Sequence, residues 1–281
     1  MSRSSSLTDR LTDDVPVRSQ KRRQQLRPRL RWARGLLLPA VLLIGWEILS
    51  GLGVFPPNLL PAPSAVLATL WELAVTGALF RHIGITLYRV ALGFVMGAAI
   101  ATVLGALTGY SRLFHGLLDP LLQSLRNIPS LAWVPLFILW MGIYETSKIA
   151  LIAVGVFFPV YLNLMSGIQG VDRKLVEVGK VHRLNSFQLI QRVFLPATLP
   201  AYIVGLRSGL GLGWMFVVAA EIMGSSQGLG FLLVDGQTTG RPTIILASIL
   251  LFAVLGKLTD AGLATIGDRL LYWQDSYHSQ P

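Results

Sequence analysis

The residues of this sequence that could do chemistry are charged and polar groups set inside long apolar runs. Arg126 and Asn127 interrupt one run, and Arg207 and Glu221 lie within a later one. A charged side chain inside a membrane span is costly, so such residues usually face a partner, a cavity or an ion pathway. Pro129 follows the first pair and frees backbone groups, which are tolerated in a membrane where they line a cavity or pack within protein.

Two interpretations of Arg126 stay open at this level. In the first, Arg126 and Asn127 face a pathway and favour an anion, because an anion crossing a medium of low dielectric needs a countercharge. In the second, Arg126 forms a structural ion pair with Glu221 or Asp119. For Glu221 itself we expect a structural or gating role near the end of its span.

Arg207 and Trp214 are further pathway candidates, and they lie in a glycine-rich stretch. Glycine recurs every four residues at 205, 209 and 213. Such a stripe lets helices approach closely. It indicates either an interface with another subunit or packing within one chain, and the spacing alone does not separate the two.

The sequence does not predict an enzyme. It contains no cysteine, and its four histidines are scattered without metal-ligand spacing. No nucleophile is matched with a base, and no G-x4-G-K-[ST] phosphate-binding loop occurs. We therefore expect no catalytic residue, no bound metal and no cofactor.

The elements that must position these groups are membrane-spanning helices. Hydrophobic residues make up 53% of the 281 residues and charged ones only 14%, whereas soluble domains have about 25% charged residues. Apolar runs of this length predict an all-α polytopic membrane protein. The transmembrane domain is expected over 35–267, with about six spans at 35–55, 84–108, 114–142 (interrupted by polar residues and prolines), 148–168, 198–223 and 243–265.

The distribution of basic residues predicts the orientation. Ten of the 24 basic residues lie in the first 34 positions, so residues 1–34 are interpreted as a disordered basic tail that anchors the N-terminus in the cytoplasm rather than as a nucleic-acid-binding segment. With six spans, eighteen basic residues fall on inner segments and four on outer ones, which are Arg81, Arg89, Lys148 and Arg241. Both termini, the C-terminal segment 268–281 and the loop 169–196 are therefore placed inside.

The loop has the pattern of a helix–turn–helix over 172–196. Leu175, Val178, Val181 and Leu184 recur at helical spacing. A second short helix follows Asn185-Ser186 and is expected to end at Leu195-Pro196. The apolar side of this pair needs a cover, which is either the membrane surface or another protein.

This loop resembles that of the permease subunits of ABC importers. In that family a Glu-Ala-Ala pattern is followed three residues later by Gly, and the loop closes with Ile-x-Leu-Pro. Glu177 begins the pattern here, Gly179 stands at the second Ala position, and 193–196 closes it with Leu195-Pro196. Arg183 occupies the family's Gly position, so we expect the turn to shift to Asn185-Ser186, both good turn formers.

The resemblance covers nearly the whole chain after the tail, and it implies a fold and partners. It implies the type I (MetI-like) importer fold in a bacterial inner membrane, and a second permease copy that completes the pore. Separate ATPase subunits would bind the loop, with Asp172, Glu177, Gly179, Arg183, Leu195 and Pro196 as coupling residues, and an extracytoplasmic binding protein would deliver the substrate. Segments such as 205–214 and 255–260 are similar to aliphatic-sulfonate permeases; nitrate, bicarbonate and taurine permeases are the alternatives.

Overall fold

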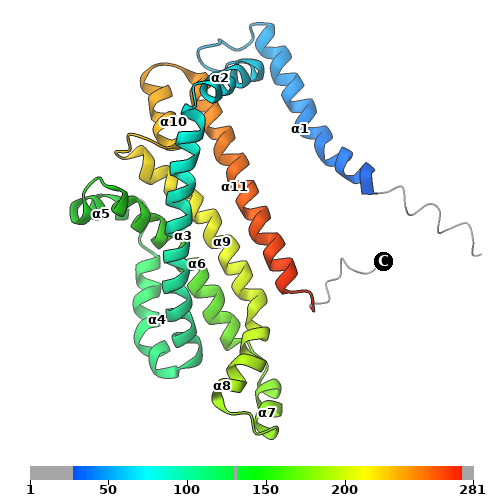
Figure 1. Ribbon diagram of the computed structural model, residues 1–281, viewed down its shortest axis with the longest axis vertical. Helices are drawn as coiled ribbons and strands as arrows, with labels where there is room; N and C mark the ends of the chain where they lie inside the picture. The colour runs from blue at the N-terminus through cyan, green and yellow to red at the C-terminus, as the bar shows by residue number, and fades with distance from the viewer. Residues whose placement is uncertain (1–27, 130–131, 274–281) are drawn as a thin grey trace, which may run out of the picture. The chain divides into compact units, whose positions relative to one another are not determined.

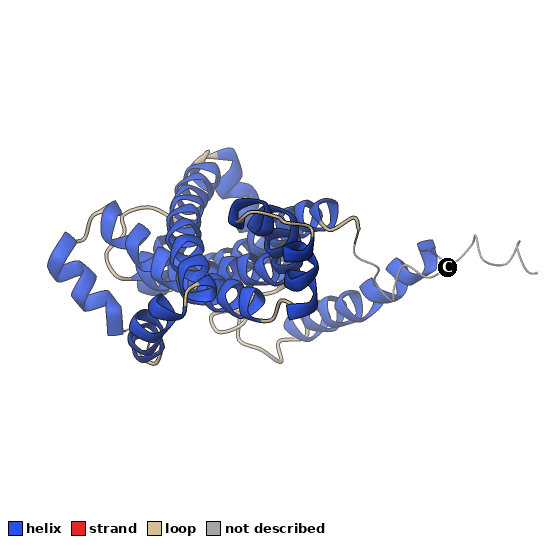
Figure 2. Cartoon of the chain, turned by 90° about the horizontal axis from the view of Figure 1, so that it is seen from below, coloured by secondary structure: helices blue, strands red, loops and turns tan. Residues whose placement is uncertain are grey.

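Every regular element in the described part of this chain is a helix (Figure 2). The computed structural model describes residues 28–129 and 132–273. Most of the expected tail, residues 1–27, and positions 274–281 of the C-terminal segment lie outside these ranges. The chain divides into two units at Pro63. The first contains α1 (Pro28–Gly51), which begins within the stretch expected to be a tail. The all-α prediction is confirmed.

The second unit is built on four helices that are long and apolar enough to cross a membrane. They are α3 (Ala78–Tyr110), α6 (Glu145–Gln169), α9 (Leu195–Ile222) and α11 (Pro242–Leu270). Each matches an expected span. At 33 residues, α3 is about 50 Å long, so it extends beyond a hydrocarbon core of about 30 Å.

The third expected span, 114–142, forms two helices instead of one. Helix α4 (Arg112–Arg126) ends at the predicted break, and α5 (Trp133–Met141) resumes after it. Pro129 explains the interruption, because a residue before proline is pushed out of the helical conformation. The break places the end of α4 and the start of α5 beside α6, which is where the candidate site lies.

Shorter helices mark the two ends of this unit (Figure 1). Helices α2 (Pro63–Val75) and α10 (Leu229–Thr238) lie at one end, which we call the α10 end. Helices α7 (Arg173–Val181) and α8 (Ser186–Leu189) lie at the other, the α7 end. Side chains of Glu72 in α2 and Arg241 before α11 are 3.5 Å apart, which joins two of the elements at the α10 end.

Helix α6 is the centre of the bundle, and glycines let its neighbours approach it. A Cβ atom at Gly97 of α3 would clash with the carbonyl oxygen of Ala153 in α6. On α9, a Cβ at Gly205 or Gly209 would lie within about 3 Å of α6 atoms. The glycine stripe at 205, 209 and 213 therefore packs within this chain, and it is not needed to explain contact with another subunit.

The loop forms the predicted helix–turn–helix, with two corrections. The Asp172 side chain accepts a hydrogen bond from Lys174 N at 2.9 Å and caps α7. Arg183 has φ 55°, so the left-handed turn stays at the family's glycine position, and the expected shift to Asn185-Ser186 is wrong. Asn185 instead caps α8 through a reciprocal pair of bonds with Gln188.

The second correction concerns the end of the loop. Its second helix does not stop at Leu195-Pro196, because a π-helical turn, Ile190–Phe194, carries it without a break into α9. Pro196 follows directly on this π-helical turn, where the regular helical hydrogen-bond ladder is already interrupted, which suits a residue without an N–H. Such π-turns are rare and often occur at functional sites.

Candidate functional site

An open cavity lies where α4 breaks off, and the two residues predicted to face a pathway line it. Its volume is about 520 Å³, within the range of small-molecule sites. Arg126 and Asn127 are the polar side chains at its wall. The remaining lining is apolar and comes from the break, α5, α6 and α9: Ile128, Pro129, Trp133, Val154, Gly155, Phe158, Pro159, Leu162, Leu212, Met215 and Phe216.

The guanidinium of Arg126 has no carboxylate partner within the described ranges. Its recorded hydrogen bond goes to the side-chain oxygen of Gln123 at 3.4 Å, and the side chain is exposed. The structural ion pair of Arg126 with Asp119 or Glu221 is therefore absent from the described residues. Asp119 accepts a bond from the Tyr161 hydroxyl instead, at 3.1 Å. An unpaired cation on an apolar wall can bind an anion, because the low dielectric there strengthens the attraction.

Glu221 belongs to a different site, a buried polar cluster at the α10 end. One of its oxygens accepts bonds from Arg89 Nη1 and Thr86 Oγ1, both at 2.8 Å. The other accepts from the backbone N–H of Gly230, also at 2.8 Å. The Glu221 carboxylate is fully buried. The cluster ties α3, α9 and the start of α10 together.

Sequence reasoning placed Arg89 and Lys148 in outer segments, and this was wrong. Both are buried, Arg89 within α3 and Lys148 within α6, with 2% and 7% of their surface exposed. The burial of Arg89 could have been predicted from its spacing from His82 and Thr86. Positions i, i+4 and i+7 share one face of a helix. A polar stripe on an otherwise apolar helix needs buried partners.

Arg207 and Trp214 lie on the face of α9 that packs on α11, away from the Arg126 cavity. Arg207 donates two bonds to the carboxylate of Asp260, each 2.9 Å long. The indole N–H of Trp214 donates to Thr259 Oγ1 at 2.9 Å. The structure thus brings Arg126 and Asn127 together, and it does not join them with Arg207, Trp214 or Glu221.

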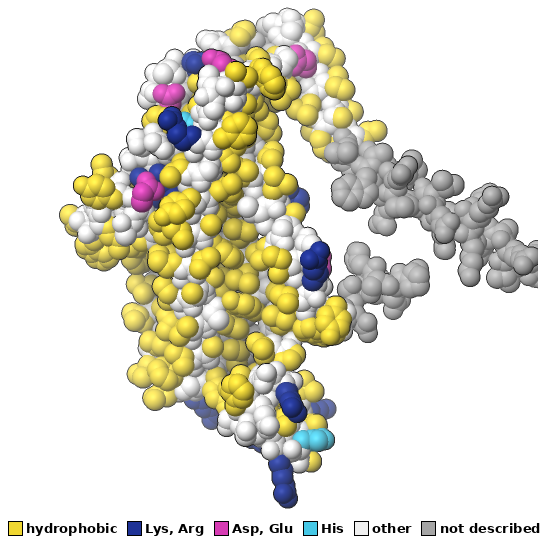
Figure 3. Space-filling model, in the orientation of Figure 1, with side chains coloured by type: hydrophobic (Ala, Val, Ile, Leu, Met, Phe, Trp, Pro, Cys, Tyr) yellow, Lys and Arg dark blue, Asp and Glu magenta, His cyan; other side chains and the backbone are white. Residues whose placement is uncertain are grey.

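Helix α7 presents an uncovered surface at its end of the bundle. Leu175, Val178 and Val181 have 50%, 55% and 80% of their surface exposed. Lysine and arginine side chains gather around this tip (Figure 3). Glu177 is also exposed and pairs with no cation in the described part of the chain. By contrast, Gly179 is buried, and a Cβ there would lie 2.6 Å from Leu189 of α8.

The amino-acid sequence of this chain is similar to those of known proteins. Residues 97–272 match the family model described as binding-protein-dependent transport system inner membrane component. An aliphatic sulfonates transport permease protein, SsuC, of Bacillus subtilis (strain 168) is 46% identical over 256 residues, which cover 91% of this chain and 93% of that protein. Its namesake in Escherichia coli (strain K12) is 37% identical, with 86% and 92% covered.

A third relative is the taurine transport system permease protein TauC of Escherichia coli (strain K12), 33% identical with 83% of this chain and 87% of that protein covered. The matched region contains the broken segment, the glycine stripe and the α7 loop. These matches confirm the resemblance of the loop and the spans to importer permeases. The chain belongs to the family of inner membrane components of binding-protein-dependent transport systems, and it is a multi-pass permease component of an ABC importer.

Proposed function

We propose that this permease carries a small aliphatic sulfonate across the membrane and that the substrate passes the Arg126 cavity. The observation that carries the proposal is the unpaired guanidinium of Arg126 on a wall that is otherwise apolar and aromatic. Two relatives named as aliphatic sulfonates permeases, 46% and 37% identical, support the same substrate class.

The chemistry of the wall suits an anion with a hydrocarbon part. A sulfonate presents oxygens in a geometry that a planar guanidinium can bind with two N–H groups. Trp133, Phe158 and Met215 offer apolar surface for the carbon chain. Nitrate or bicarbonate has no apolar part to place there, and taurine adds an ammonium group. Nitrate, bicarbonate and taurine remain the alternative substrates.

The exposed α7 surface is proposed to dock into a groove of a separate ATPase subunit. Its apolar side chains would be covered there, while Asp172 holds the first turn and Gly179 keeps α7 packed on α8. Glu177, Arg183, Leu195 and Pro196 complete the coupling region. In this proposal the α7 end and both chain termini face the cytoplasm, and the α10 end faces the substrate-binding protein.

A second copy of this permease is proposed to complete the pore. The Arg126 cavity supports this, because it is open in the single chain and its lining comes from helices that leave one side unclosed. The face of the bundle drawn in Figure 3 is rich in hydrophobic side chains, as lipid contact requires.

Substrate identity is tested by uptake in a bacterium that lacks its own sulfonate permease and expresses this chain with its binding protein and ATPase. We expect growth on an alkanesulfonate as sole sulfur source and uptake that excess nitrate does not inhibit. Growth on taurine alone, or nitrate uptake without sulfonate uptake, would assign the chain to an alternative substrate.

The ATPase contact is tested with Val181→Asp, which puts a charge on the most exposed apolar position of α7, and with Glu177→Ala. Both variants should reduce co-purification of the ATPase or uncouple ATP hydrolysis from uptake. Arg112→Ala is the matched control, because Arg112 is exposed outside the loop, at the start of α4. Full assembly and full uptake in both loop variants would show that α7 is not the docking helix.

A further inference from the structure

Arg89 connects two carboxylates whose surroundings differ sharply. Its Nη1 donates to Glu221 and to the Gln227 carbonyl, both at 2.8 Å. Its Nε and Nη2 donate to the two oxygens of Glu145, both at 2.6 Å. The Glu221 side chain has no exposed surface, whereas 46% of the Glu145 side chain is exposed. One guanidinium therefore joins a fixed group to an accessible one.

The Glu221 side of the cluster is fixed by close packing as well as by hydrogen bonds. A Cβ atom at Gly228 would lie 2.5 Å from the Glu221 carboxylate, so the loop that leads to α10 is wrapped tightly around it. The N–H of Gly228 donates to His82 and that of Leu229 donates to Thr86, at 3.0 and 2.9 Å. Helices α3, α9 and α10 thus form one block at this end.

The Glu145 side is held mainly by polar contacts. Glu145 is the first residue of α6, directly after the turn 142–144 that joins it to α5. Gly142 in that turn has φ 73°. The ammonium group of Lys148 donates to the carbonyl oxygen of Ile143 in the turn at 3.2 Å and to the carboxylate of Glu145 at 3.3 Å. Arg89 and Lys148 together hold the turn against the block.

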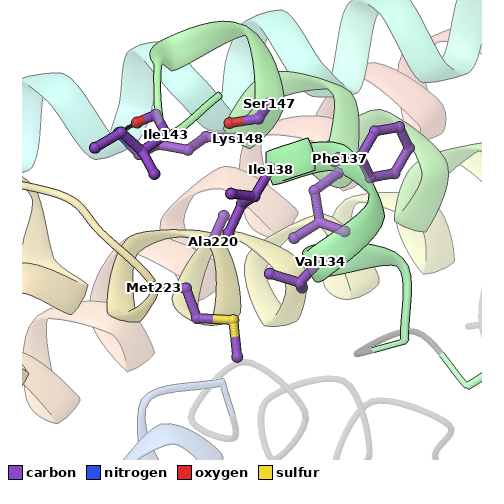
Figure 4. A pocket seen from close by; sticks show the side chains of 9 residues that line it. Val134, Phe137, Ile138, Ile143, Ser147, Lys148, Ala220 and Met223 are labelled. Atoms are coloured by element: carbon purple, nitrogen blue, oxygen red, sulfur yellow. Dashed lines mark hydrogen bonds between the residues drawn. The ribbon is translucent and has the colours of Figure 1, made fainter. Parts of the chain in front are cut away.

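Helix α5 links this turn to the cavity. At its start Trp133 lines the Arg126 cavity. Farther along, its side chains Val134 and Ile138 face Ala220 and Met223 at the end of α9 across a small gap of about 10 Å³ (Figure 4). Its outer side is uncovered, with Leu139 78% and Trp140 64% exposed. Helix α5 has nine residues and is a separate element from α4 and α6, which precede and follow it in the chain.

We propose that α5 and the turn 142–144 are the closure of the cavity at the α10 end, and that the Arg89–Glu145 contact is the latch that holds this closure shut. The proposal rests on the proposed transport function and names the part of the site that opens. Releasing Glu145 from Arg89 removes the hydrogen bonds that join the turn to α3, while the Arg89–Glu221 contact keeps the rest of that end assembled. Arg89, Glu145 and Lys148 act as positioning residues and need not touch the substrate.

The latch is tested with Glu145→Gln in the complete complex with its ATPase. The variant keeps the shape of the side chain and removes one charge-assisted contact, which shifts a closed–open equilibrium by about tenfold. We expect ATP hydrolysis in the absence of binding protein and substrate to rise several-fold, up to about tenfold. Glu72→Gln is the matched control, since it removes an exposed carboxylate at the same end. Equal basal hydrolysis in the two variants would overturn the latch.

An engineered disulfide, which can be formed and reduced, provides a second test of the proposal. A Cβ at Gly224 would lie 3.8 Å from the Cβ of Ile143, which matches the separation in a disulfide. The chain contains no cysteine, so the double substitution Ile143→Cys and Gly224→Cys introduces a single pair of cysteines. Gly224 has φ 108°, so the reduced double-cysteine variant, which carries the same substitution, is the reference for the oxidised one. Oxidation should abolish uptake with the complex intact, and reduction should restore it.

The outcomes separate this proposal from the proposed function. If the wild-type complex imports no sulfonate, the proposed function fails. If the wild type imports sulfonate but the oxidised and reduced variants transport equally, the closure is not at the turn 142–144. If the reduced variant is inactive, the disulfide experiment is not used. The proposal is then decided by comparing the basal ATP hydrolysis of the Glu145→Gln complex with that of the Glu72→Gln complex.

Discussion

Replacing Glu221 by Gln should destabilise this permease far more than the small change in structure suggests. One oxygen of Glu221 accepts from Arg89 and Thr86, and the other accepts from the N–H of Gly230. A glutamine amide replaces one of these oxygens by a donor, so either Arg89 or Gly230 would face an N–H group. Removal of one partner of a buried ion pair costs about 3–5 kcal/mol. Because Arg89 keeps Glu145, we expect the lower part of that range.

The assay is titration of the purified permease with a denaturing detergent, followed by loss of helical signal. Glu72→Gln serves as the control, because its contact with Arg241 is exposed and 3.5 Å long, and such pairs contribute about 0–1 kcal/mol. We expect Glu221→Gln to lower the free energy of unfolding by about 3 kcal/mol and Glu72→Gln to leave it nearly unchanged. Equal unfolding of the two variants would show that the Glu221 cluster does not hold α3, α9 and α10 together.

Three further outcomes follow from the packing. Gly179→Val places a side chain 2.6 Å from Leu189, so it should displace α7 and lower ATPase co-purification about tenfold. Unchanged recovery of the ATPase in a pull-down would contradict the packing argument. Trp214→Phe removes the bond to Thr259 and should lower the free energy of unfolding by about 0.5–1.5 kcal/mol; an unchanged free energy would contradict the contribution of this bond. The half-exposed Arg207–Asp260 pair should show a coupling of about 0.2–1 kcal/mol in a double-mutant cycle of alanine variants; a value above about 3 kcal/mol would mean that the pair is desolvated.

The features of the fold that depend on local sequence patterns were predicted from the sequence. The four long helices follow from apolar runs, the break at Pro129 from proline chemistry, and the loop helices from the spacing of Leu175, Val178 and Val181. The family's glycine position keeps its left-handed turn although arginine occupies it, because the chain reversal between α7 and α8 requires that conformation there. Local preference for Asn185-Ser186 as the turn was overridden, and Asn185 became a helix cap instead.

The buried cluster could not be found in the same way. Arg89 and Glu221 are 132 positions apart, and their contact exists only after α3 and α9 pack on α6. Counting Arg89 and Lys148 as outer charges followed from treating each basic residue alone. The polar stripe formed by His82, Thr86 and Arg89 was visible in the sequence, but the stripe does not identify the residues that these side chains contact. The Arg126 cavity was better predicted, because a cation, an amide and a proline break occur together within four residues.

The most direct test of the central claim is the initial rate of alkanesulfonate uptake into proteoliposomes that contain the complete complex. Loss of a bond to a charged group costs about 1.5–3 kcal/mol, or at least about tenfold in rate or affinity. We predict that Arg126→Ala lowers uptake by this factor with assembly intact, that Arg126→Lys retains part of it, and that Arg269→Ala, which removes an exposed arginine elsewhere, transports like the wild type. Wild-type uptake by an intact Arg126→Ala complex would contradict the assignment of the cavity as the substrate pathway.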